Sequence, residues 1–152
     1  MAYSVGQLQQ LLIDAGCPAD KVVVLAAVGM AESSGNPNAV NDGKGTRSTE
    51  YSVGLWQINT LAHKNYTIAQ LKDPRINARE AVRILKVQGL RAWGAYTDGR
   101  YIRTGWLAKS QAARPSGVPA GDNSAANSDL ALSSNDDLWL VAGVVVLALL
   151  LA

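Results

Sequence analysis

The sequence predicts a mainly α-helical domain with minimal β-structure, followed by a flexible linker and a C-terminal hydrophobic helix. Three observations lead to this prediction. Helix start and stop signals recur along the first two thirds of the chain, one early segment is apolar on every side, and the composition becomes rich in Pro, Gly, Ser, Ala and Asn after Leu107. We therefore expect a folded domain over residues 1–107, a linker over 108–137 and a terminal helix over 138–152.

The first predicted helix begins just after Ser4. Ser4 and Gln7, three residues apart, form the pattern of a capping box, in which each side chain bonds the backbone N–H of the other. The segment "QLQQLLIDAG" continues the helix, and Gly16 ends it, as glycine does just past the last helical turn.

The second predicted helix is the apolar one. Pro18 and Asp20 provide its start, and Gly35 with Pro37 provides its end. Within residues 22–31 every residue except one glycine is hydrophobic. A helix that is apolar on every side is normally buried against neighbours all round, so we expect this helix at the centre of the domain.

A long polar loop and an apolar run follow. Residues 36–52 are rich in Asn, Asp, Gly, Ser and Thr and are typical of a functional loop. Residues 53–61, "VGLWQINTL", are mostly apolar, but Gln57 and Asn59 interrupt the run. Gln57 is difficult to explain by packing alone, which favours a functional role.

Two further helices are marked by their start signals. Thr67 is placed to cap a short helix that ends near Leu71. Asp73 followed by Pro74 marks a longer helix that runs to about Gly89, because proline is favoured at the first helical position. The residues of this helix with core spacing are Ala78, Ala81, Val82 and Leu85.

The C-terminal part has two predicted segments. Residues 108–137 contain almost nothing to bury, which is typical of a linker. Leu138 to Ala152 is free of charge and, as a helix, would be about 22 Å long, short of the ~30 Å hydrocarbon core of a bilayer. We favour a terminal membrane anchor, with a buried core helix or a contact with other proteins as the alternative.

Composition narrows the function classes. The 152 residues, 48% of them hydrophobic, suit one domain with a modest core. Residues 1–108 carry 12 Lys/Arg and 8 Asp/Glu, whereas residues 109–152 carry 2 and 4. This mild positive charge suits an anionic surface such as a cell wall or membrane, but it lacks the dense basic patches of nucleic-acid-binding proteins. We expect no nucleic-acid partner.

The chain has one cysteine and one histidine, which argues against an intrachain disulfide and against a zinc site. Cys17 alone forms no intrachain disulfide, and His63 alone disfavours a zinc site, which normally has three or four ligands. We expect no metal and no cofactor. The start of the chain, "MAYSVGQLQQ", lacks the basic region and apolar core of a signal peptide.

Glu32 is a carboxylate at the end of the apolar helix. The helix dipole and burial both disfavour an ionised carboxylate there. The position therefore favours the protonated form, which a general acid needs. The alternative is a structural role, in which Glu32 caps backbone or pairs with an arginine such as Arg79 or Arg83.

Two stretches resemble a known family. "AESSGNPNAVN" followed by "SVGLWQIN" resembles the signature of the lysozyme-like lytic transglycosylases, the soluble-transglycosylase and goose-type lysozyme superfamily. The later "DPRINAREAVRILKVQGLRAWGAYTDGRY" is similar to lysozyme-like domains of phage structural proteins. The resemblance covers about residues 20–103, with the motifs in the family's order. It implies a lysozyme-like fold, α+β with minimal β, for the domain.

The resemblance also implies roles for individual residues. Glu32 matches the family's general acid and base, and Ser33 matches a residue that helps to orient the acid and the sugar. Tyr96 matches a cleft tyrosine that stabilises the reacting centre, although Tyr96, like Trp56 and Trp93, would equally suit a protein core. The other residues expected to bind substrate are Ser52, Gly54, Leu55, Trp56, Gln57 and Asn59.

The resemblance implies cleavage of peptidoglycan glycan strands by one carboxylate. In a lytic transglycosylase the acid protonates the oxygen between N-acetylmuramic acid and N-acetylglucosamine, and the sugar's own 6-hydroxyl then attacks, which gives a 1,6-anhydro product. A hydrolytic lysozyme would need a second carboxylate to activate water. Asp42 and Glu50, both in the 36–52 loop, are the candidates for it. We favour the transglycosylase.

Two alternatives come from other classes. In the first, Cys17 and His63 form the catalytic pair of a cysteine amidase or peptidase, since Cys17 precedes a helix start, which lowers the pKa of a thiol. In the second, the domain is a non-catalytic module that binds the wall or serves as a structural protein.

The domain organisation also suggests a place of action. A wall-cleaving domain joined by a linker to a hydrophobic segment suits a phage virion, with Leu138 to Ala152 in an internal membrane or against other virion proteins. A membrane-anchored lysis enzyme in the host cell is the alternative.

Overall fold

The computed structural model describes residues 1–43 and 51–119. Residues 44–50 and the chain from residue 120 onward, including the segment 138–152 predicted as a helix, lie outside the described residues. The longer helices are α1 (Val5–Asp14), α2 (Val22–Ser33), α4 (Pro74–Gln88) and α7 (Trp106–Ala112). The shorter elements are η1 (Ala19–Lys21), β1 (Val40–Asn41), β2 (Ser52–Val53), β3 (Ile58–Asn59), α3 (Ile68–Leu71), η2 (Leu90–Ala92), α5 (Gly94–Thr97) and α6 (Arg100–Arg103). The predicted mainly α-helical class with minimal β-structure is confirmed.

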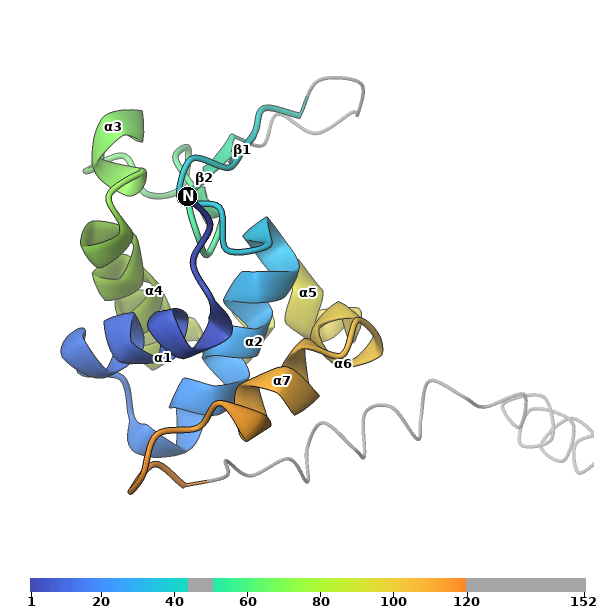
Figure 1. Ribbon diagram of the computed structural model, residues 1–152. Helices are drawn as coiled ribbons and strands as arrows, with labels where there is room; N and C mark the ends of the chain where they lie inside the picture. The colour runs from blue at the N-terminus through green and yellow to red at the C-terminus, as the bar shows by residue number, and fades with distance from the viewer. Residues whose placement is uncertain (44–50, 120–152) are drawn as a thin grey trace, which may run out of the picture. The chain divides into compact units, whose positions relative to one another are not determined.

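Helix α2 forms the centre of the domain, as its apolar sequence predicts. Every residue from Val22 to Met30 is buried. Helices α1, α5, α6 and α7 all pack against it, and Figure 1 shows α1 and α7 crossing it on the near side. The helix emerges from this packing only at its last turn, which ends at Ser33.

A buried polar network joins the two ends of the domain. Gln9 of α1 donates to the hydroxyl of Ser110 at 2.8 Å and to its carbonyl at 2.7 Å. The Ser110 hydroxyl in turn donates to the carbonyl of Val23 in α2 at 2.7 Å. Because buried polar groups destabilise a fold unless they are paired, these bonds fix α7 against α1 and α2.

The position of α7 corrects one sequence prediction. We expected the linker to begin at residue 108, but α7 runs to Ala112 and buries Leu107 and Ser110. Ala and Ser are compatible with both a linker and a helix, and it is the contact with Gln9 and Val23 that decides between them here. Within the described residues, no helix is long and apolar enough to cross a membrane.

The local start and stop signals act as predicted. Ser4 and Gln7 form the capping box of α1, and Thr67 with Gln70 forms that of α3. Asp73 accepts two backbone N–H groups at the start of α4, where proline occupies the first turn. The core-facing residues predicted for α4, namely Ala78, Ala81, Val82 and Leu85, are buried.

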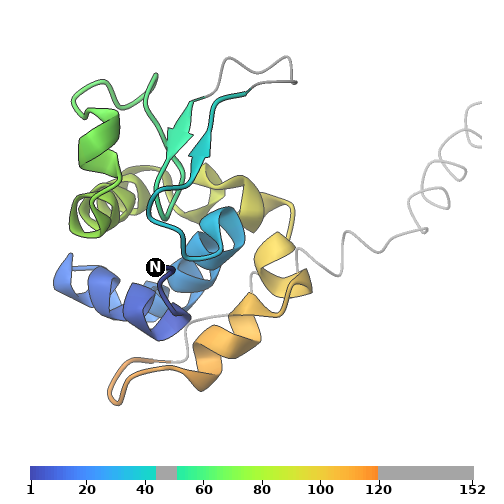
Figure 2. The ribbon, with the colours of Figure 1, turned by 45° about the horizontal axis from the view of Figure 1, so that its top comes forward.

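A small antiparallel sheet in the order β1-β2-β3 stands beyond the end of α2 (Figure 2). Val53 pairs with Val40 on one side and with Ile58 on the other. Strand β1 lies within residues 36–52, which were predicted as one polar loop, and β2 begins at the end of that region. Strand β3 lies within the apolar run of residues 53–61. Strands of two residues each are too short to give a recognisable alternating pattern.

The turn between β2 and β3 is held by α4. Gly54 has φ +85°, and a Cβ atom there would lie 2.2 Å from Nδ2 of Asn77 and 2.4 Å from the carbonyl oxygen of Leu71. Only glycine fits this close approach. The turn then brings Trp56 into the core, where its Nε1 donates to the carbonyl of Leu25 at 2.9 Å.

Candidate active site

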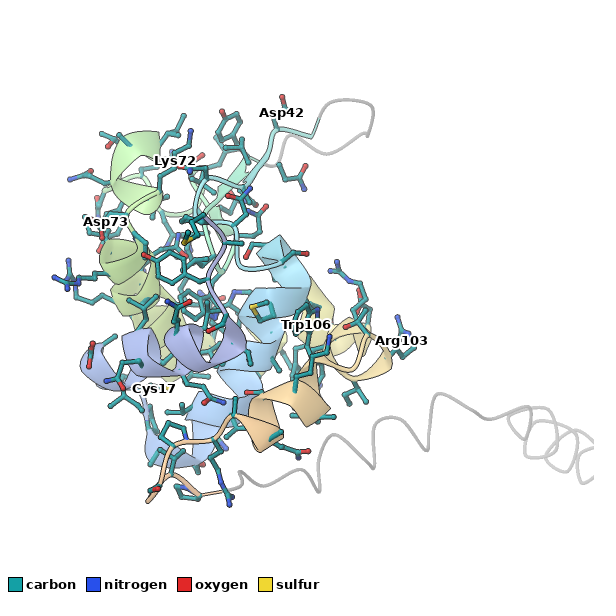
Figure 3. All side chains as sticks on the ribbon, viewed as in Figure 1. Cys17, Asp42, Lys72, Asp73, Arg103 and Trp106 are labelled. Carbon is teal, nitrogen blue, oxygen red and sulfur yellow. The ribbon has the colours of Figure 1, made fainter. Side chains whose placement is uncertain are left out.

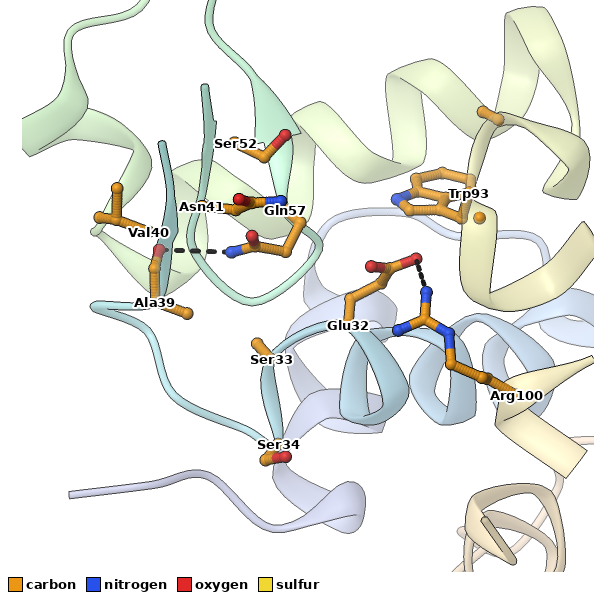
Figure 4. Close-up of a pocket in the computed structure, with 12 residues that line it drawn as sticks. Glu32, Ser33, Ser34, Ala39, Val40, Asn41, Ser52, Gln57, Trp93 and Arg100 are labelled. Carbon is orange, nitrogen blue, oxygen red and sulfur yellow. Dashed lines mark hydrogen bonds and ion pairs between the residues drawn. The ribbon is translucent and has the colours of Figure 1, made fainter. Parts of the chain in front are cut away.

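A cleft of about 540 Å³ opens at the C-terminal end of α2. Its volume lies in the range of ligand-binding sites. The end of α2 forms the base, the small sheet with its β2–β3 turn forms one wall, and the segment from η2 to α6 forms the other (Figure 4). The lining residues are Glu32, Ser33, Ser34, Ala39, Val40, Asn41, Ser52, Gln57, Ala92, Trp93, Gly94 and Arg100.

Glu32 stands at the base of the cleft with its two carboxylate oxygens in different environments. Oε1 accepts the backbone N–H of Ala95 at 2.8 Å, which ties the end of α2 to the start of α5. Oε2 has no hydrogen-bond partner among the described residues and faces the Gln57 side of the cleft (Figure 4). With only 13% of its side chain exposed, Glu32 presents one fixed and one available oxygen to the cleft.

Arg100 lies beside Glu32 and is held by Asp98. Nη2 of Arg100 is 3.8 Å from Oε1 of Glu32, and Nε of Arg100 donates to Oδ2 of Asp98 at 2.8 Å. Burial acts to raise the pKa of Asp98, but the hydrogen bonds from Arg100 and the positive charges nearby outweigh it, so the pKa is lowered. Glu32 thus has both the backbone bond and the arginine neighbour of the structural alternative, but the arginine is Arg100 and not Arg79 or Arg83.

Ser33 and Gln57 line the cleft, but the hydrogen bonds of their side chains go to backbone atoms. The Ser33 hydroxyl donates to the carbonyl of Gly29 at 3.0 Å and accepts the N–H of Gly35, so it closes the end of α2. Gln57 adopts φ +45°, and its Nε2 donates to the carbonyls of Ala39 and Gly54 at 3.3 and 3.0 Å. Gln57 thereby joins the β2–β3 turn to the segment before β1.

Several residues predicted to bind substrate do not line the cleft. Leu55 and Trp56 are fully buried in the core. Gly54 is buried against α4, and Asn59 uses its Oδ1 to accept the backbone N–H of Leu61. The resemblance implied that all four of these residues bind substrate. In the structure only Gln57 of the β2–β3 turn and Ser52 of β2 reach the cleft, because the turn directs the residues between them into the core.

The aromatic residues divide between core and cleft. Trp93 lines the cleft and donates from Nε1 to the carbonyl of Trp56 at 2.9 Å, whereas Trp56 itself belongs to the core. Tyr96 is half-buried and stacks on Tyr101 with ring centroids 5.3 Å apart, and it does not line the cleft. The sequence pattern contained no signal that would separate Trp93 from Trp56, nor any that would single out Arg100.

Of the two candidates for a second carboxylate, the structure describes only Asp42. Asp42 is exposed and does not line the cleft, and Figure 3 shows it beyond β1, pointing away from the end of α2. Glu50 lies outside the described residues. Among the residues that the structure describes, Glu32 is thus the carboxylate that reaches the cleft.

Cys17 and His63 do not form a catalytic pair in this structure. Burial, chiefly, raises the pKa of the Cys17 thiol to about 12, which opposes thiolate formation. Nδ1 of His63 lies 2.7 Å from Oε1 of Glu80, within a separate cluster. Cys17 also precedes the start of α2, whereas Glu32 lies at its end, about 15 Å further along at 1.5 Å per residue.

The comparison with protein families agrees with this arrangement. Residues 9–95 match the family model described as a lysozyme-like domain. The chain belongs to this lysozyme-like family. No curated protein and no solved structure matches the chain. The matched region contains α2 with Glu32, the sheet and Trp93, and it ends at Ala95, whose N–H bonds Glu32. The lysozyme-like domain indicates a glycosidase that acts on peptidoglycan.

Proposed function

We propose that this lysozyme-like protein is a lytic transglycosylase, which cleaves the β-1,4 bond between N-acetylmuramic acid and N-acetylglucosamine. The observation that supports this best is the asymmetric setting of Glu32. One oxygen is held by the N–H of Ala95 at 2.8 Å, so the other faces the cleft in a fixed orientation. A reaction in which a single carboxyl serves first as acid and then as base requires such an oxygen.

The proposed reaction balances with Glu32 alone. Glu32 protonates the glycosidic oxygen, the bond from that oxygen to C1 of the muramic sugar breaks, and the sugar's acetamide stabilises the positive charge at C1. The 6-hydroxyl of the same sugar then bonds to C1, and the Glu32 carboxylate takes the hydroxyl proton. The products are a 1,6-anhydro sugar and a free 4-hydroxyl, and no water is consumed.

Mass spectrometry of fragments released from purified peptidoglycan tests this proposal. The full-length chain is compared with Glu32→Gln, which keeps the shape of the side chain but has no acidic proton. We expect fragments one water lighter than hydrolysis products from the wild type. We expect a loss of at least about a hundredfold in rate from Glu32→Gln, the lower part of the range for general acid–base catalysis.

Other results would favour the alternatives. Fragments at the hydrolysis mass would identify a muramidase, and Asp42→Asn and Glu50→Gln would then show which carboxylate activates the water. Binding to peptidoglycan without release of fragments would instead identify a wall-binding or structural module.

We further propose, from the sequence alone, that the protein belongs to a phage virion and acts on the host cell wall. The hydrophobic segment Leu138 to Ala152 would hold it in a membrane or against other virion proteins. Detection of the chain in purified particles would support this location. Its presence only in host membranes at lysis would favour the anchored lysis enzyme.

A further inference from the structure

The positive charge of this protein is concentrated in one part of the sequence. Residues 60–92 carry seven Lys/Arg and two Asp/Glu, a net charge of +5, whereas the whole chain carries +2. The remainder of the chain therefore has a net charge of −3. Four of the seven cations belong to α4, the helix that also holds the β2–β3 turn.

These four cations form a row along the outer face of α4, which we call the basic row. Its members, Arg75, Arg79, Arg83 and Lys86, are all exposed, and their spacing of four, four and three residues places them on one face of the helix. At 1.5 Å per residue the row is about 16 Å long. Among the described residues, Arg83 is the member of the row that forms an ion pair, and its partner is Glu80.

The charges of the basic row are not balanced on the outer face of the helix. Like charges three or four residues apart destabilise a helix, whereas an acidic residue at the same spacing stabilises it. The one acidic residue of α4, Glu80, points inward, where 1% of its side chain is exposed. Asp73, just before the helix, caps it by accepting the backbone N–H groups of Arg75 and Ile76. The outer face thus stays positive at a cost to helix stability, which an anionic partner would offset.

The basic row is separate from the cleft. No residue of α4 is among those that line the cleft, and the helix supports its wall through Asn77, which is fully buried on the face opposite the row. Figure 1 shows α4 at one edge of the domain and α6, which carries Arg100, at the other. A partner of the row and a glycan strand in the cleft can therefore be bound at the same time.

A polar recess of about 370 Å³ adjoins the basic row at Arg83. Among the residues that line it are Lys64, Asn65 and Tyr66 from the segment before α3, and Glu80 and Arg83 from α4. The Glu80 carboxylate is already bound by Arg83, from Nε at 2.8 Å and from Nη2 at 2.7 Å. Because this carboxylate is paired, the recess offers an anion the ammonium group of Lys64 and the amide of Asn65.

We propose that the basic row and this recess form a second binding surface, which holds carboxylate groups of the stem peptides of peptidoglycan. The lysozyme-like domain acts on peptidoglycan, whose peptides carry free carboxylates at intervals along each glycan strand. A linear series of such anions matches a linear row of cations, and arginine binds a carboxylate with two parallel hydrogen bonds. The surface retains the domain on the wall between cleavage events. This inference goes beyond the proposed function, since it requires peptidoglycan as the partner but no particular cleavage reaction.

Two other anionic partners fit the basic row less well. A helix that lies in a membrane surface inserts its apolar face, but the apolar face of α4 is buried in the domain, as Ala78, Ala81 and Leu85 show. Proteins that bind single-stranded nucleic acids add aromatic side chains on which the bases stack, and α4 contains no aromatic residue. Peptidoglycan, in contrast, is a polyanion that the cleft itself brings to the domain.

Co-sedimentation with insoluble peptidoglycan tests the proposal. The peptidoglycan is first freed of phosphate-containing polymers, and the parent protein is the full-length chain with Glu32→Gln, so that the wall is not consumed. The row variant adds Arg75→Gln, Arg79→Gln and Lys86→Gln to the parent. Arg83 is kept, because its removal would leave a buried carboxylate without its main partner.

A matched control removes the same amount of charge elsewhere. It adds Lys21→Gln, Lys109→Gln and Arg114→Gln to the parent, which are surface cations outside residues 60–92 that do not line the cleft. The row variant and the control therefore have the same net charge and differ in where the cations are missing. Thermal unfolding verifies that each protein is folded.

We expect the row variant to bind the wall more weakly than the parent by a factor between about three and about a hundred, the range for three exposed ion pairs. The control should bind as the parent does. The loss in the row variant should shrink as salt is added, because salt screens exposed charges. Amidation of the carboxyl groups of the peptidoglycan should weaken binding of the parent and remove its advantage over the row variant.

Several results would overturn the inference. Equal binding of the row variant and the parent would do so, as would an equal loss in the control, which would show an effect of net charge alone. Unchanged binding of the parent to amidated peptidoglycan would exclude the stem-peptide carboxylates. Binding through the row to phosphatidylglycerol vesicles, without binding to the wall, would identify a membrane surface instead. Fragment release by the wild type is measured separately, so its absence would refute the proposed function and leave wall binding through the row intact.

Discussion

Asn77 of α4 supplies the hydrogen bonds that hold the turn after β2. Its Oδ1 accepts the backbone N–H of Trp56 at 2.9 Å, and its Nδ2 donates to the carbonyls of Val53 and Leu71 at 3.0 and 2.8 Å. The side chain is fully buried. One amide therefore connects α4 with the wall of the cleft that carries Gln57.

Asn77→Asp tests how much this amide contributes. The substitution keeps the shape but replaces the donor with a second oxygen, which would face the carbonyls of Val53 and Leu71. We expect the free energy of unfolding to fall by about 2–4 kcal/mol, because a buried polar group loses its partners. Urea unfolding at neutral pH measures this loss. The exposed Asn65→Asp is the control, and equal stability of the two variants would contradict the role given to Asn77.

Gly29 provides the space for Trp56 in the core. A Cβ atom at Gly29 would lie 2.7 Å from Nε1 of Trp56 and 3.0 Å from Leu8. We expect Gly29→Ala to destabilise the protein by about 1–3 kcal/mol through overpacking, despite the better helix propensity of alanine.

Gly6→Ala is the matched control for this effect. It also replaces a helical glycine, but its nearest contact would be an ordinary 3.9 Å from Ala113. The propensity gain of roughly 0.5–1 kcal/mol should then raise its stability. Thermal unfolding of both variants decides the matter, and a stabilised Gly29→Ala would mean that Trp56 is not tightly packed.

Glu80 should make stability depend on pH in the acidic range. Its buried carboxylate binds Arg83 at 2.7 and 2.8 Å and His63 at 2.7 Å. Burial acts to raise the pKa of Glu80, but the hydrogen bonds and charges of Arg83 and His63 outweigh it and lower the pKa from its ordinary 4.5. A carboxyl with a lowered pKa in the folded state stabilises the protein above its unfolded pKa, and this contribution is lost as the pH falls through the folded value.

Glu80→Gln removes the contribution and identifies its source. At neutral pH we expect the variant to be less stable than the wild type by about 1.5–3 kcal/mol, as for hydrogen bonds to a charged group. The difference should shrink as the pH falls below 4.5. Urea unfolding over a pH series measures it, with the exposed Asp20→Asn as the comparison. A difference that stays constant with pH would show that the ionisation of Glu80 is not responsible.

Cys17 should be chemically inert in the folded protein. Because the pKa of its thiol is raised to about 12, labelling by a thiol reagent at neutral pH should be more than about a hundredfold slower than in the urea-unfolded chain. Cys17→Ser should leave peptidoglycan cleavage unchanged. Rapid labelling of the folded chain, together with loss of activity in the serine variant, would restore the cysteine enzyme as an explanation.

Features that depend on neighbours in sequence were predictable. The capping boxes at Ser4 and Thr67, the Asp73-Pro74 helix start and the buried course of α2 each follow from residues a few positions apart. The sequence also predicted Glu32 at the end of the apolar helix, and the structure places it in a cleft. Its catalytic role stays a prediction that the Glu32→Gln experiment tests.

Features that depend on residues distant in sequence were not predictable. Trp56 lies in the core, where it bonds the carbonyl of Leu25, and Trp93 lies in the cleft, where it bonds the carbonyl of Trp56 in the β2–β3 turn. Neither contact produces a periodic pattern in the sequence. Arg100 follows a turn of the chain that brings it back to Glu32. The end of the domain beyond Leu107 was missed for the same reason, since α7 gains its stability from α1 and α2.

The enclosure of α2 by four other helices also governs how the protein would fail under stress. A helix covered along its length opens only when its neighbours separate, so its amide protons should exchange with solvent only in global unfolding. Glu32 lies in the last turn of that helix, which emerges from the packing but is tied to α5 by the bond from the N–H of Ala95 at 2.8 Å. Heat or urea would then abolish cleavage in the same all-or-none transition that melts the domain, and no partly active, loosened form would precede it.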